Sequence, residues 1–364
     1  MRNGMSKTLH LSDSPAPLVV TGAGGWLGRA LSSHIVANAQ SLGISRYVAL
    51  VRTNEEKKLL EAELVGISTV KSDIRLCDVT STDAINSVLV DLNPDNESSF
   101  DLIHTAGIIH PKKIQDLYQV NEVGTRNIMK FALDHHARKV VHVSSNSPFG
   151  NNPHSKDLFR SIEPFNPYMA YGESKMRGEI AVQEAVSQGL HAVIVRPPWF
   201  YGPFQPARQT TFFSMVKAGR FPVFGDGSQH RSMVFIDNLV DGVFRARQWT
   251  GEPGKGWWIA DQTPYRVSEI VSLVGQALRD EGHDVKTNRL RIPNIVGSFA
   301  ETADALIQKT GRYVQQVHVL GEMNKTIACD ISASTSELGY IPQTSLYEGM
   351  RQSIRWCAEQ GIEL

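Results

Sequence analysis

The stretch TGAGGWLG, residues 21–28, spaces three glycines evenly, at Gly22, Gly25 and Gly28. It follows the apolar run LVV and opens an amphipathic stretch, 26–40. Between a strand and a helix such glycines have separate tasks: one makes the turn, one admits a pyrophosphate to the backbone, and one lets helix and strand pack closely. The helix that begins there offers free N–H groups and a favourable dipole to phosphates. The segment predicts a dinucleotide-binding turn, and a glycine-rich turn without a ligand is the alternative.

Short apolar runs alternate with longer amphipathic stretches through the first half of the chain. The expected strands are 18–21, 47–51, 100–106, 139–145 and 191–197, and the expected helices are 26–40, 114–136 and 167–188. Nearly continuous apolar strands that alternate with helices indicate a parallel sheet covered on both faces. The predicted fold class is therefore α/β, a doubly wound parallel sheet of the Rossmann type, with a smaller C-terminal substrate-binding region.

After residue 198 the regular alternation ends. The segments YGPFQPARQ and FGDGSQHR are rich in Gly, Pro and polar residues, as loops are. Helical patterns return at 266–281 and 344–358. We expect a flexible leader at 1–17, a dinucleotide-binding domain at 18–198 to which 232–262 returns, and a substrate-binding region made of 199–231 and 263–364.

The composition is that of an ordinary globular protein. Among 364 residues, 37 basic side chains balance 37 acidic ones, so no net charge draws the chain to nucleic acid or to an anionic membrane. No apolar run approaches the ~18 residues of a membrane span, and three cysteines without a C-x-x-C pair argue against a disulfide framework or a zinc site. We expect a small-molecule substrate, no metal, no nucleic-acid or membrane partner, and a cytoplasmic location, because no signal-peptide core is visible.

The residue after the second expected strand bears on the choice of cofactor. In a dinucleotide fold this position faces the adenosine ribose, where an acidic side chain would accept hydrogen bonds from the 2′-hydroxyl. This chain has Arg52 there, in VALVRTNE, and an arginine suits a 2′-phosphate. The sequence therefore favours NADP, with NAD as the alternative. A solvated arginine beside Glu55 and Glu56 is the other interpretation.

The segment YGESK, residues 171–175, places Tyr171 and Lys175 on one face of a helix. A phenol with a pKa of ~10 is a poor acid or base at neutral pH, and a nearby ammonium lowers that pKa. Such a pair can move a proton to or from a substrate oxygen. The serines of HVSSNSPFG end an expected strand at the carboxyl edge of the sheet, where a hydroxyl can bind the reacting oxygen. Each pattern alone is common. The glycine turn, the serines and the Tyr–Lys pair, found in this order along the chain, are informative together.

In this order the motifs resemble the extended short-chain dehydrogenase/reductase superfamily, in its epimerase/dehydratase and 3β-hydroxysteroid-dehydrogenase branch. The resemblance covers roughly residues 18–356 and rests on TGAGGWLG, CDV, HTAG, VNEVGT, SSNSPFG, RPPWFYGP, GDGSQHRSMVFIDN and LGYIPQTSLYEGM. It implies Ser145, Tyr171 and Lys175 as catalytic residues, and a homodimer formed by the helices within 114–136 and 167–188. The cofactor-binding residues that it implies, together with the residues predicted above, are Gly22, Gly25, Trp26, Leu27, Gly28, Arg52, Asp78, Val79, Thr105, Ala106, Gly107, Asn121, Tyr171, Lys175 and Pro198.

The resemblance leaves the substrate open. The expected substrate-binding residues are His110, Ser145, Asn146, Trp199 and Arg231. Many nucleotide-sugar members have asparagine where this chain has Trp199, whereas Arg231 matches the arginine that such members direct at the diphosphate. We expect an NAD(P)-dependent oxidoreductase or epimerase that acts on a secondary alcohol or ketone of a sugar nucleotide or related sugar. The alternatives are a 3β-hydroxysteroid or lipid-ketone dehydrogenase, and a catalytically silent regulator that senses NADP.

Overall fold

The computed structural model describes residues 15–67, 69–92 and 99–364. Its centre is a seven-stranded parallel sheet in the order β11-β6-β5-β4-β1-β2-β3. The strands are β1 (Ala16–Thr21), β2 (Ile44–Val51), β3 (Ser72–Leu76), β4 (Asp101–His104), β5 (Lys139–Val143), β6 (Ala192–Arg196) and β11 (Gly256–Trp258). The predicted doubly wound parallel sheet is confirmed. Because β1 lies between β2 and β4, the winding reverses there, and a ligand crevice is expected at the carboxyl ends of these strands.

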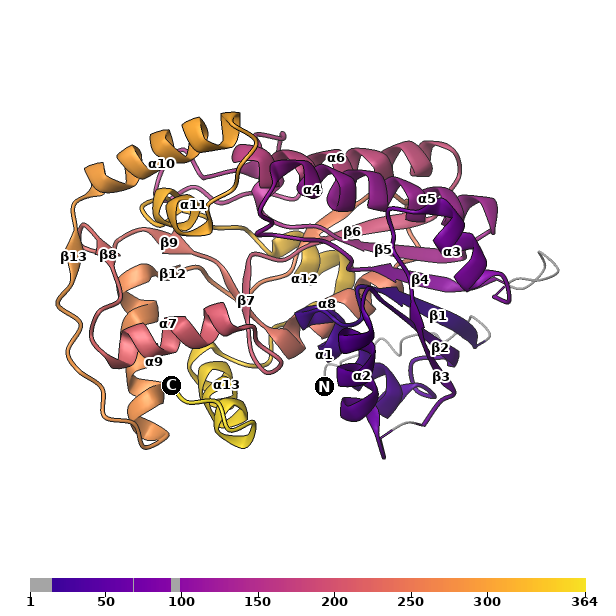
Figure 1. The fold of residues 1–364 in the computed structure, drawn as a ribbon, viewed down its shortest axis with the longest axis horizontal. Coiled ribbons are helices and arrows are strands. Elements are labelled where there is room, and N and C mark those ends of the chain that lie inside the picture. The colour runs from indigo at the N-terminus through magenta and orange to yellow at the C-terminus, as the bar shows by residue number, and fades with distance from the viewer. Residues whose placement is uncertain (1–14, 68, 93–98) are drawn as a thin grey trace, which may run out of the picture.

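Helices cover both faces of this sheet (Figure 1). One layer consists of α1 (Trp26–Asn38), α2 (Asn54–Leu64) and α8 (Ile236–Arg247), and the other of α3 (Thr82–Leu89), α5 (Thr125–Asp134) and α6 (Met169–Ser187). Strand side chains on both faces are therefore fully buried, among them Val19, Val20, Ile103 and Val141. Burial on both faces explains why these strands have continuous apolar runs in the sequence.

The two edge strands lie outside the expected strand list. In β3, Asp73 accepts hydrogen bonds from Arg46 of β2, and Arg75 donates to Asp91. Charged pairs of this kind replace an apolar run, so an edge strand gives a weak signal in the sequence. At the other edge β11 pairs with β6, which brings part of 232–262 into the main sheet.

The single helix predicted over 114–136 is interrupted. α4 (Ile114–Leu117) continues into a π-helical segment, Tyr118–Gly124, and then into α5. Such wider turns occur often at functional sites, and this one contains the fully buried Asn121. The leader expected at 1–17 lies outside the described residues as far as residue 14, and β1 already begins at Ala16.

Most of the remaining elements gather beyond the carboxyl edge of the sheet, at the left of Figure 1. The helices of this part are α7 (Ala207–Lys217), α9 (Val267–Asp280), α10 (Asn294–Lys309), α11 (Gln315–Glu322) and α13 (Leu346–Glu359), whereas α12 (Ser332–Leu338) packs near β11. Its short paired strands are β7 (Trp199–Tyr201) with β10 (Met233–Phe235), β9 (His230–Arg231) with β12 (Tyr265–Arg266), and β8 (Val223–Phe224) with β13 (Arg291–Ile292). Within the described ranges, no helix has the length and apolar character needed to cross a bilayer.

Candidate active site

The glycine turn between β1 and α1 leaves no room for side chains. Gly22 has φ +68°, and a Cβ there would lie 2.7 Å from the backbone of Ala106. A Cβ on Gly28 would lie 2.7 Å from the Ala23 Cα and closer still to the Gly22 carbonyl oxygen. Gly25 precedes α1 without a side-chain cap, and the first turn carries no acid, so the helix N–H groups remain available to an anion. This cradle fits the pyrophosphate of a dinucleotide.

The loop after β4 is tied to the same turn. Thr105 Oγ1 donates to the Thr21 carbonyl at 2.7 Å, and the Ala106 N–H donates to Thr21 Oγ1 at 3.2 Å. The Asn121 amide donates to the Ile108 carbonyl and accepts from the Ile108 N–H, both at 2.9 Å. Because Asn121 is fully buried, it holds this loop in place and does not itself face the crevice.

Of three further residues expected at the cofactor, Asp78 is exposed, whereas Val79 and Leu27 are buried. Asp78 is exposed, and its carboxylate accepts from the Thr80 N–H at 2.9 Å. Val79 is buried against Gly124, where a Cβ would lie 2.8 Å from a Val79 methyl group, and Leu27 is buried in the core. Asp78 therefore presents a polar group to solvent, whereas Val79 and Leu27 support the backbone.

Arg52 follows β2 as expected, but an acid lies beside it. The Arg52 side chain is 65% exposed, and its Nη2 lies 3.9 Å from Glu56 Oε1. Glu56 Oε2 accepts the Arg52 backbone N–H at 2.8 Å. The Glu56 side chain also packs on Gly24, because a Cβ there would lie 2.7 Å from the Glu56 Cβ. A carboxylate from α2 thus occupies the space between β2 and the glycine turn.

Ser145, Tyr171 and Lys175 converge at the carboxyl edge of the sheet. Ser145 follows β5, and the other two lie in the first two turns of α6. Ser145 and Tyr171 line the same cavity, and the Ser145 hydroxyl is near enough to the Tyr171 phenol to lower its pKa. Lys175 Nζ donates to the Val143 carbonyl at 3.0 Å, and a Cβ on Gly107 would lie 4.0 Å from that nitrogen. The fold thus brings Ser145 and Tyr171 to one cavity and places Lys175 behind them, on the carbonyl of the last residue of β5.

Burial is the largest influence on the pKa values of Tyr171 and Lys175, and it corrects the expected direction for Tyr171. The pKa of Tyr171 is raised by burial, and the Ser145 hydroxyl and the charge of Arg208 offset only part of the effect. Burial lowers the pKa of Lys175 to about 8, against an opposing effect of Glu179. The expected lowering of the tyrosine pKa by Lys175 is absent, because the ammonium is directed at the Val143 carbonyl.

Two histidines lie near Lys175 and carry no charge. The rings of His104 and His142 stack with centroids 5.3 Å apart, on the neighbouring strands β4 and β5. Burial lowers the pKa of His104 to about 3 and that of His142 well below its usual value. The positive charge of Lys175 contributes to lowering the pKa of both imidazoles.

A cavity of about 800 Å³ opens beside Tyr171. It receives Trp26 and Pro198 from the expected cofactor site and all five residues of the expected substrate site, namely His110, Ser145, Asn146, Trp199 and Arg231. Much of the remaining wall is apolar and consists of Phe212, Met215, Phe221, Val271, Leu320 and Met323. Cofactor and substrate residues that are far apart in the sequence thus line one space.

Several predicted substrate residues are already engaged by other parts of the protein. His110 Nδ1 lies 2.9 Å from the Tyr313 hydroxyl, and burial lowers the His110 pKa to about 4. Arg231 Nη2 donates to the Glu322 carbonyl at 2.5 Å. Trp199 Nε1 donates to Gln209 Oε1 of α7 at 3.3 Å. These contacts fix the side chains in place at the cavity wall.

Three residues at the cavity were missed by sequence reasoning. Arg208 of α7 lies 5.7 Å from the centre of the Trp26 ring, and within the described ranges it has no hydrogen-bond or ion-pair partner. His318 and Glu322 come from α11, which no motif marks. Arg208 could have been noted as a cation shortly after the YGP segment, whereas α11 gave no such signal.

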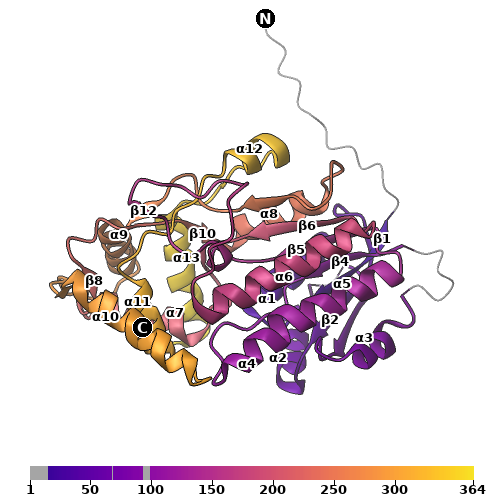
Figure 2. The same ribbon diagram turned by 90° about the horizontal axis from the view of Figure 1, so that it is seen from above.

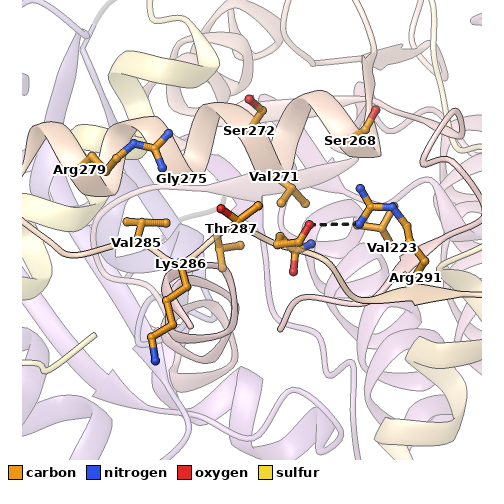
Figure 3. A pocket seen from close by; sticks show the side chains of 12 residues that line it. Val223, Ser268, Val271, Ser272, Gly275, Arg279, Val285, Lys286, Thr287 and Arg291 are labelled. Carbon is orange, nitrogen blue, oxygen red and sulfur yellow. Dashed lines mark hydrogen bonds between the residues drawn. The ribbon is translucent and has the colours of Figure 1, made fainter. Parts of the chain in front are cut away.

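A second cavity, of about 350 Å³, lies away from Tyr171. It is bounded by α7, α9 and the segment that leads into β13 (Figure 3). Its charged side chains are Arg279, Lys286 and Arg291, and none of the residues predicted for the cofactor or the substrate lines it. The chemistry of the candidate active site therefore belongs to the larger cavity.

Comparison with known proteins gives the family. A model of the NAD dependent epimerase/dehydratase family matches residues 18–260, which confirms the resemblance seen in the sequence. The chain belongs to this family. The family member described here is 42% identical over 355 residues to the uncharacterized protein y4nL of Sinorhizobium fredii (strain NBRC 101917 / NGR234), across 95% of this chain and 96% of the relative.

More distant relatives of this epimerase/dehydratase-family protein have named activities. It is 22% identical to the dTDP-glucose 4,6-dehydratase of Haemophilus influenzae, over 93% of this chain and 97% of that enzyme. The crystal structure of UDP-glucuronic acid 4-epimerase from Bacillus cereus in complex with NAD matches with a TM-score of 0.71 and 18% identity, covering 94% of this chain and 99% of that one. This structural likeness establishes the fold.

Proposed function

We propose that the protein is an NAD(P)-dependent oxidoreductase that moves a hydride at a secondary alcohol or ketone. The observation that carries the proposal is that Ser145 and Tyr171 line a cavity that Trp26 of the glycine turn also lines, with the buried Lys175 one helical turn from Tyr171. A proton-transfer group, a hydroxyl for the reacting oxygen and a cation thus lie beside a pyrophosphate cradle. Family membership supports the same class of chemistry.

The proposed roles follow from the geometry. The nicotinamide, when bound, supplies the donor or acceptor of the hydride. Ser145 donates a hydrogen bond to the substrate oxygen, and Tyr171 transfers the proton that this oxygen gains or loses. Because burial raises the pKa of Tyr171, the phenol is protonated at neutral pH, and the protein alone is prepared to protonate a ketone oxygen. Lys175 lies one turn further along α6 and supplies a buried positive charge to this part of the site.

The roles are tested by removing the phenol oxygen. Tyr171→Phe keeps the ring but cannot transfer a proton, so kcat should fall by ~10²–10⁴-fold, while the Kd for the dinucleotide stays within about twofold because the cradle is intact. The matched control is Tyr347→Phe in α13, whose hydroxyl bonds to Asp280 away from the cavity. A panel of nucleotide sugars and apolar ketones serves as substrate. If Tyr171→Phe turns over within about threefold of the unchanged protein, the proposed mechanism is wrong.

For the cofactor we propose NAD in preference to NADP, although Arg52 alone favours NADP. The Glu56 carboxylate lies between β2 and the glycine turn, at 2.8 Å from the Arg52 N–H. It can accept hydrogen bonds from ribose hydroxyls, and it would repel a 2′-phosphate. Calorimetry should give tighter binding of NAD than of NADP, and Glu56→Gln should narrow the difference by about tenfold. Glu55→Gln, one residue away, is the matched control, and tighter binding of NADP to the unchanged protein would refute the preference.

For the substrate we propose a sugar nucleotide or related sugar, held by the region that comprises 199–231 and 263–364. Arg231 lines the cavity and can contact a diphosphate, although it now donates to the Glu322 carbonyl. A second candidate is an apolar ketone, favoured by the wall of Phe212, Met215 and Phe221. Binding of UDP-, dTDP-, GDP- or CDP-sugars, weakened by Arg231→Ala, would support the first. Turnover of apolar ketones without any nucleotide-sugar binding would support the second.

Two further parts of the proposal concern the assembly and the location. We propose a homodimer through α5 and α6, which follows from the family resemblance. A cytoplasmic location agrees with the three cysteines, all free and buried. A catalytically silent regulator is the remaining alternative, and any dinucleotide-dependent turnover abolished in Tyr171→Phe excludes it.

A further inference from the structure

Helix α10 turns its large apolar side chains toward solvent. At 3.6 residues per turn, positions 295, 299, 302 and 306 fall on one stripe of the helix. On this stripe Ile295 is 62% exposed, Phe299 68% and Leu306 59%, and the exposed residue between them, Thr302, is uncharged. We call these four residues the α10 stripe.

The acidic side chains of α10 lie on the opposite side, against the protein. Asp304 is fully buried and pairs with His318 Nδ1 at 2.7 Å, and Glu301 pairs with Lys325 at 2.7 Å. The Gln308 side chain accepts the backbone N–H of Ala170, the residue before Tyr171, at 3.1 Å. A surface helix normally buries its apolar stripe and exposes its charges. The polar contacts fix α10 in the reverse orientation, so its outward stripe lacks the partner that apolar residues need.

Cations border both ends of the α10 stripe. After α10 the chain pairs with the segment before α4, through a bridge between Lys113 and Arg312. The exposed cations at this end are Lys112, Lys113, Lys309 and Arg312; none has an acidic partner within the described ranges, and Asp116 is an exposed acid nearby. At the other end Arg289 and Arg291 are exposed just before α10, and Arg291 lines the basic cavity of Figure 3.

By its area alone, the α10 stripe is too small to hold a second copy of the chain. A helix of 16 residues is about 24 Å long and about 10 Å wide, so it offers about 240 Å², well below the roughly 800 Å² that each partner buries in a stable complex. Figure 2 shows α10 on the same side of the molecule as α5 and α6. Those helices, through which we propose the homodimer, pair charges within the chain, as in Arg126–Glu184 and Arg177–Glu173. The large apolar side chain that they expose is Ile180, at 37%, so they do not continue the strongly exposed α10 stripe.

We propose that α10 is the surface by which the protein rests on an anionic lipid membrane. The α10 stripe would enter the boundary between headgroups and acyl chains, and the cations at its ends would meet the lipid phosphates. An apolar stripe with basic ends and no acid of its own complements such a surface. The proposal is independent of the proposed function. It also has a consequence for that function, because α11, which packs on α10, lines the active-site cavity with His318 and Leu320.

The test is cosedimentation of the full chain with lipid vesicles. Phosphatidylcholine vesicles that contain phosphatidylglycerol should retain the protein, and pure phosphatidylcholine vesicles should retain much less. Added salt should release it, because screening weakens the attraction of the cations. Phe299→Ser, and Ile295→Ser with Leu306→Ser, should each weaken binding by about tenfold or more, since each removes buried apolar area. The matched control is Ile162→Ser, a side chain 91% exposed elsewhere on the surface, which should bind like the unchanged protein.

The outcomes separate the proposal from its rivals. Dinucleotide affinity and thermal unfolding should be the same in all these variants, which excludes loss of the fold as the cause of weaker binding. Failure of the unchanged protein to bind phosphatidylglycerol vesicles would overturn the proposal. So would binding that Phe299→Ser leaves intact. If the unchanged protein does not bind vesicles and Phe299→Ser lowers its sedimentation coefficient by breaking an oligomer, the α10 stripe is instead an interface with a second copy of the chain.

Discussion

The glycine turn at the end of β1 and the cavity wall built by α7 and α11 meet at Tyr171, yet they are specified differently. In the turn the backbone itself forms the site, and side chains are excluded because a Cβ on Gly22 or Gly28 has no space. In the wall, side chains from separate elements form the site, and its polar groups depend on single contacts such as that of Arg231 with the Glu322 carbonyl. A backbone site tolerates few residue types, whereas a side-chain site can change with each substitution. We therefore expect substitutions in the turn to affect dinucleotide binding and substitutions in the wall to affect substrate binding.

The largest effect should come from a side chain placed in the turn. Gly28→Val puts a Cβ about 2.7 Å from the Ala23 Cα, where neither neighbour can move because both are backbone. Overpacking of this kind typically costs ~1–3 kcal/mol, so dinucleotide binding should weaken by up to ~100-fold and the melting temperature should fall. Gly275→Ala in α9 is the control: its Cβ would make ordinary contact at 3.7 Å, and the helix should gain up to ~1 kcal/mol. Normal dinucleotide affinity in Gly28→Val would remove the distinction between the two regions.

The next effect concerns Lys175 of α6, whose Nζ donates to the Val143 carbonyl. Its pKa of about 8 means that the ammonium is lost as the pH rises through that value, so kcat/KM should fall on the alkaline side. Lys175→Arg retains its charge and should move this alkaline limb upward, even if its absolute rate is lower. Lys175→Met should lower the rate at every pH. If kcat/KM of Lys175→Arg falls at the same alkaline pH as that of the unchanged protein, another group is responsible for the fall.

The same lysine has an effect on stability with a definite sign. Its folded pKa of about 8 lies below the usual 10.5, so between these values the unfolded chain binds more protons than the folded one. Its contribution to the free energy of unfolding therefore rises with pH across this window and is unfavourable below it. Melting temperatures of Lys175→Met and the unchanged protein, measured from pH 6 to 10, should differ most at the acid end. A difference that is constant with pH would contradict the assignment.

A smaller effect should separate the wall from the turn. Asp304→Asn weakens the buried pair with His318, which joins α10 to α11. The local cost should be about 1–3 kcal/mol, and substrate KM should rise because α11 lines the cavity. The dinucleotide Kd, measured by calorimetry, should not change. If both constants change together, the wall and the turn are coupled more tightly than their separate contacts indicate.

The smallest effect is expected at Arg52. Its guanidinium is 65% exposed and 3.9 Å from Glu56, so the ion pair is weak in water. Arg52→Ala should change NAD affinity by less than about threefold. A much larger loss of dinucleotide affinity, above all one confined to NADP, would support the sequence-based expectation that Arg52 selects NADP.

What the sequence predicted follows the same division. The buried strands, the glycine turn and the Tyr–Lys pair were predictable because each rests on short-range rules: apolar runs, residues without side chains, and helical spacing. The edge strand β3 escaped because Asp73 and Arg75 replace apolar residues there. Glu56 escaped because its position on Gly24 depends on how α2 packs. The tyrosine pKa was mistaken because neighbours in the sequence say little about the depth of burial.

The π-helical segment at Tyr118–Gly124 has a consequence for the phase of the helix that contains it. The wider turn changes the angular position around the helix axis of the residues before it relative to those after it. Within this segment Asn121 faces Ile108. Shortening the segment by one residue would restore regular α-helical bonding and rotate one part against the other by about 100°. The helix would gain regularity, and the loop after β4 would lose the Asn121 amide that holds Ile108. A local imperfection in the helix thus sets the angular position of a residue that no regular helix of this length would direct to the same place.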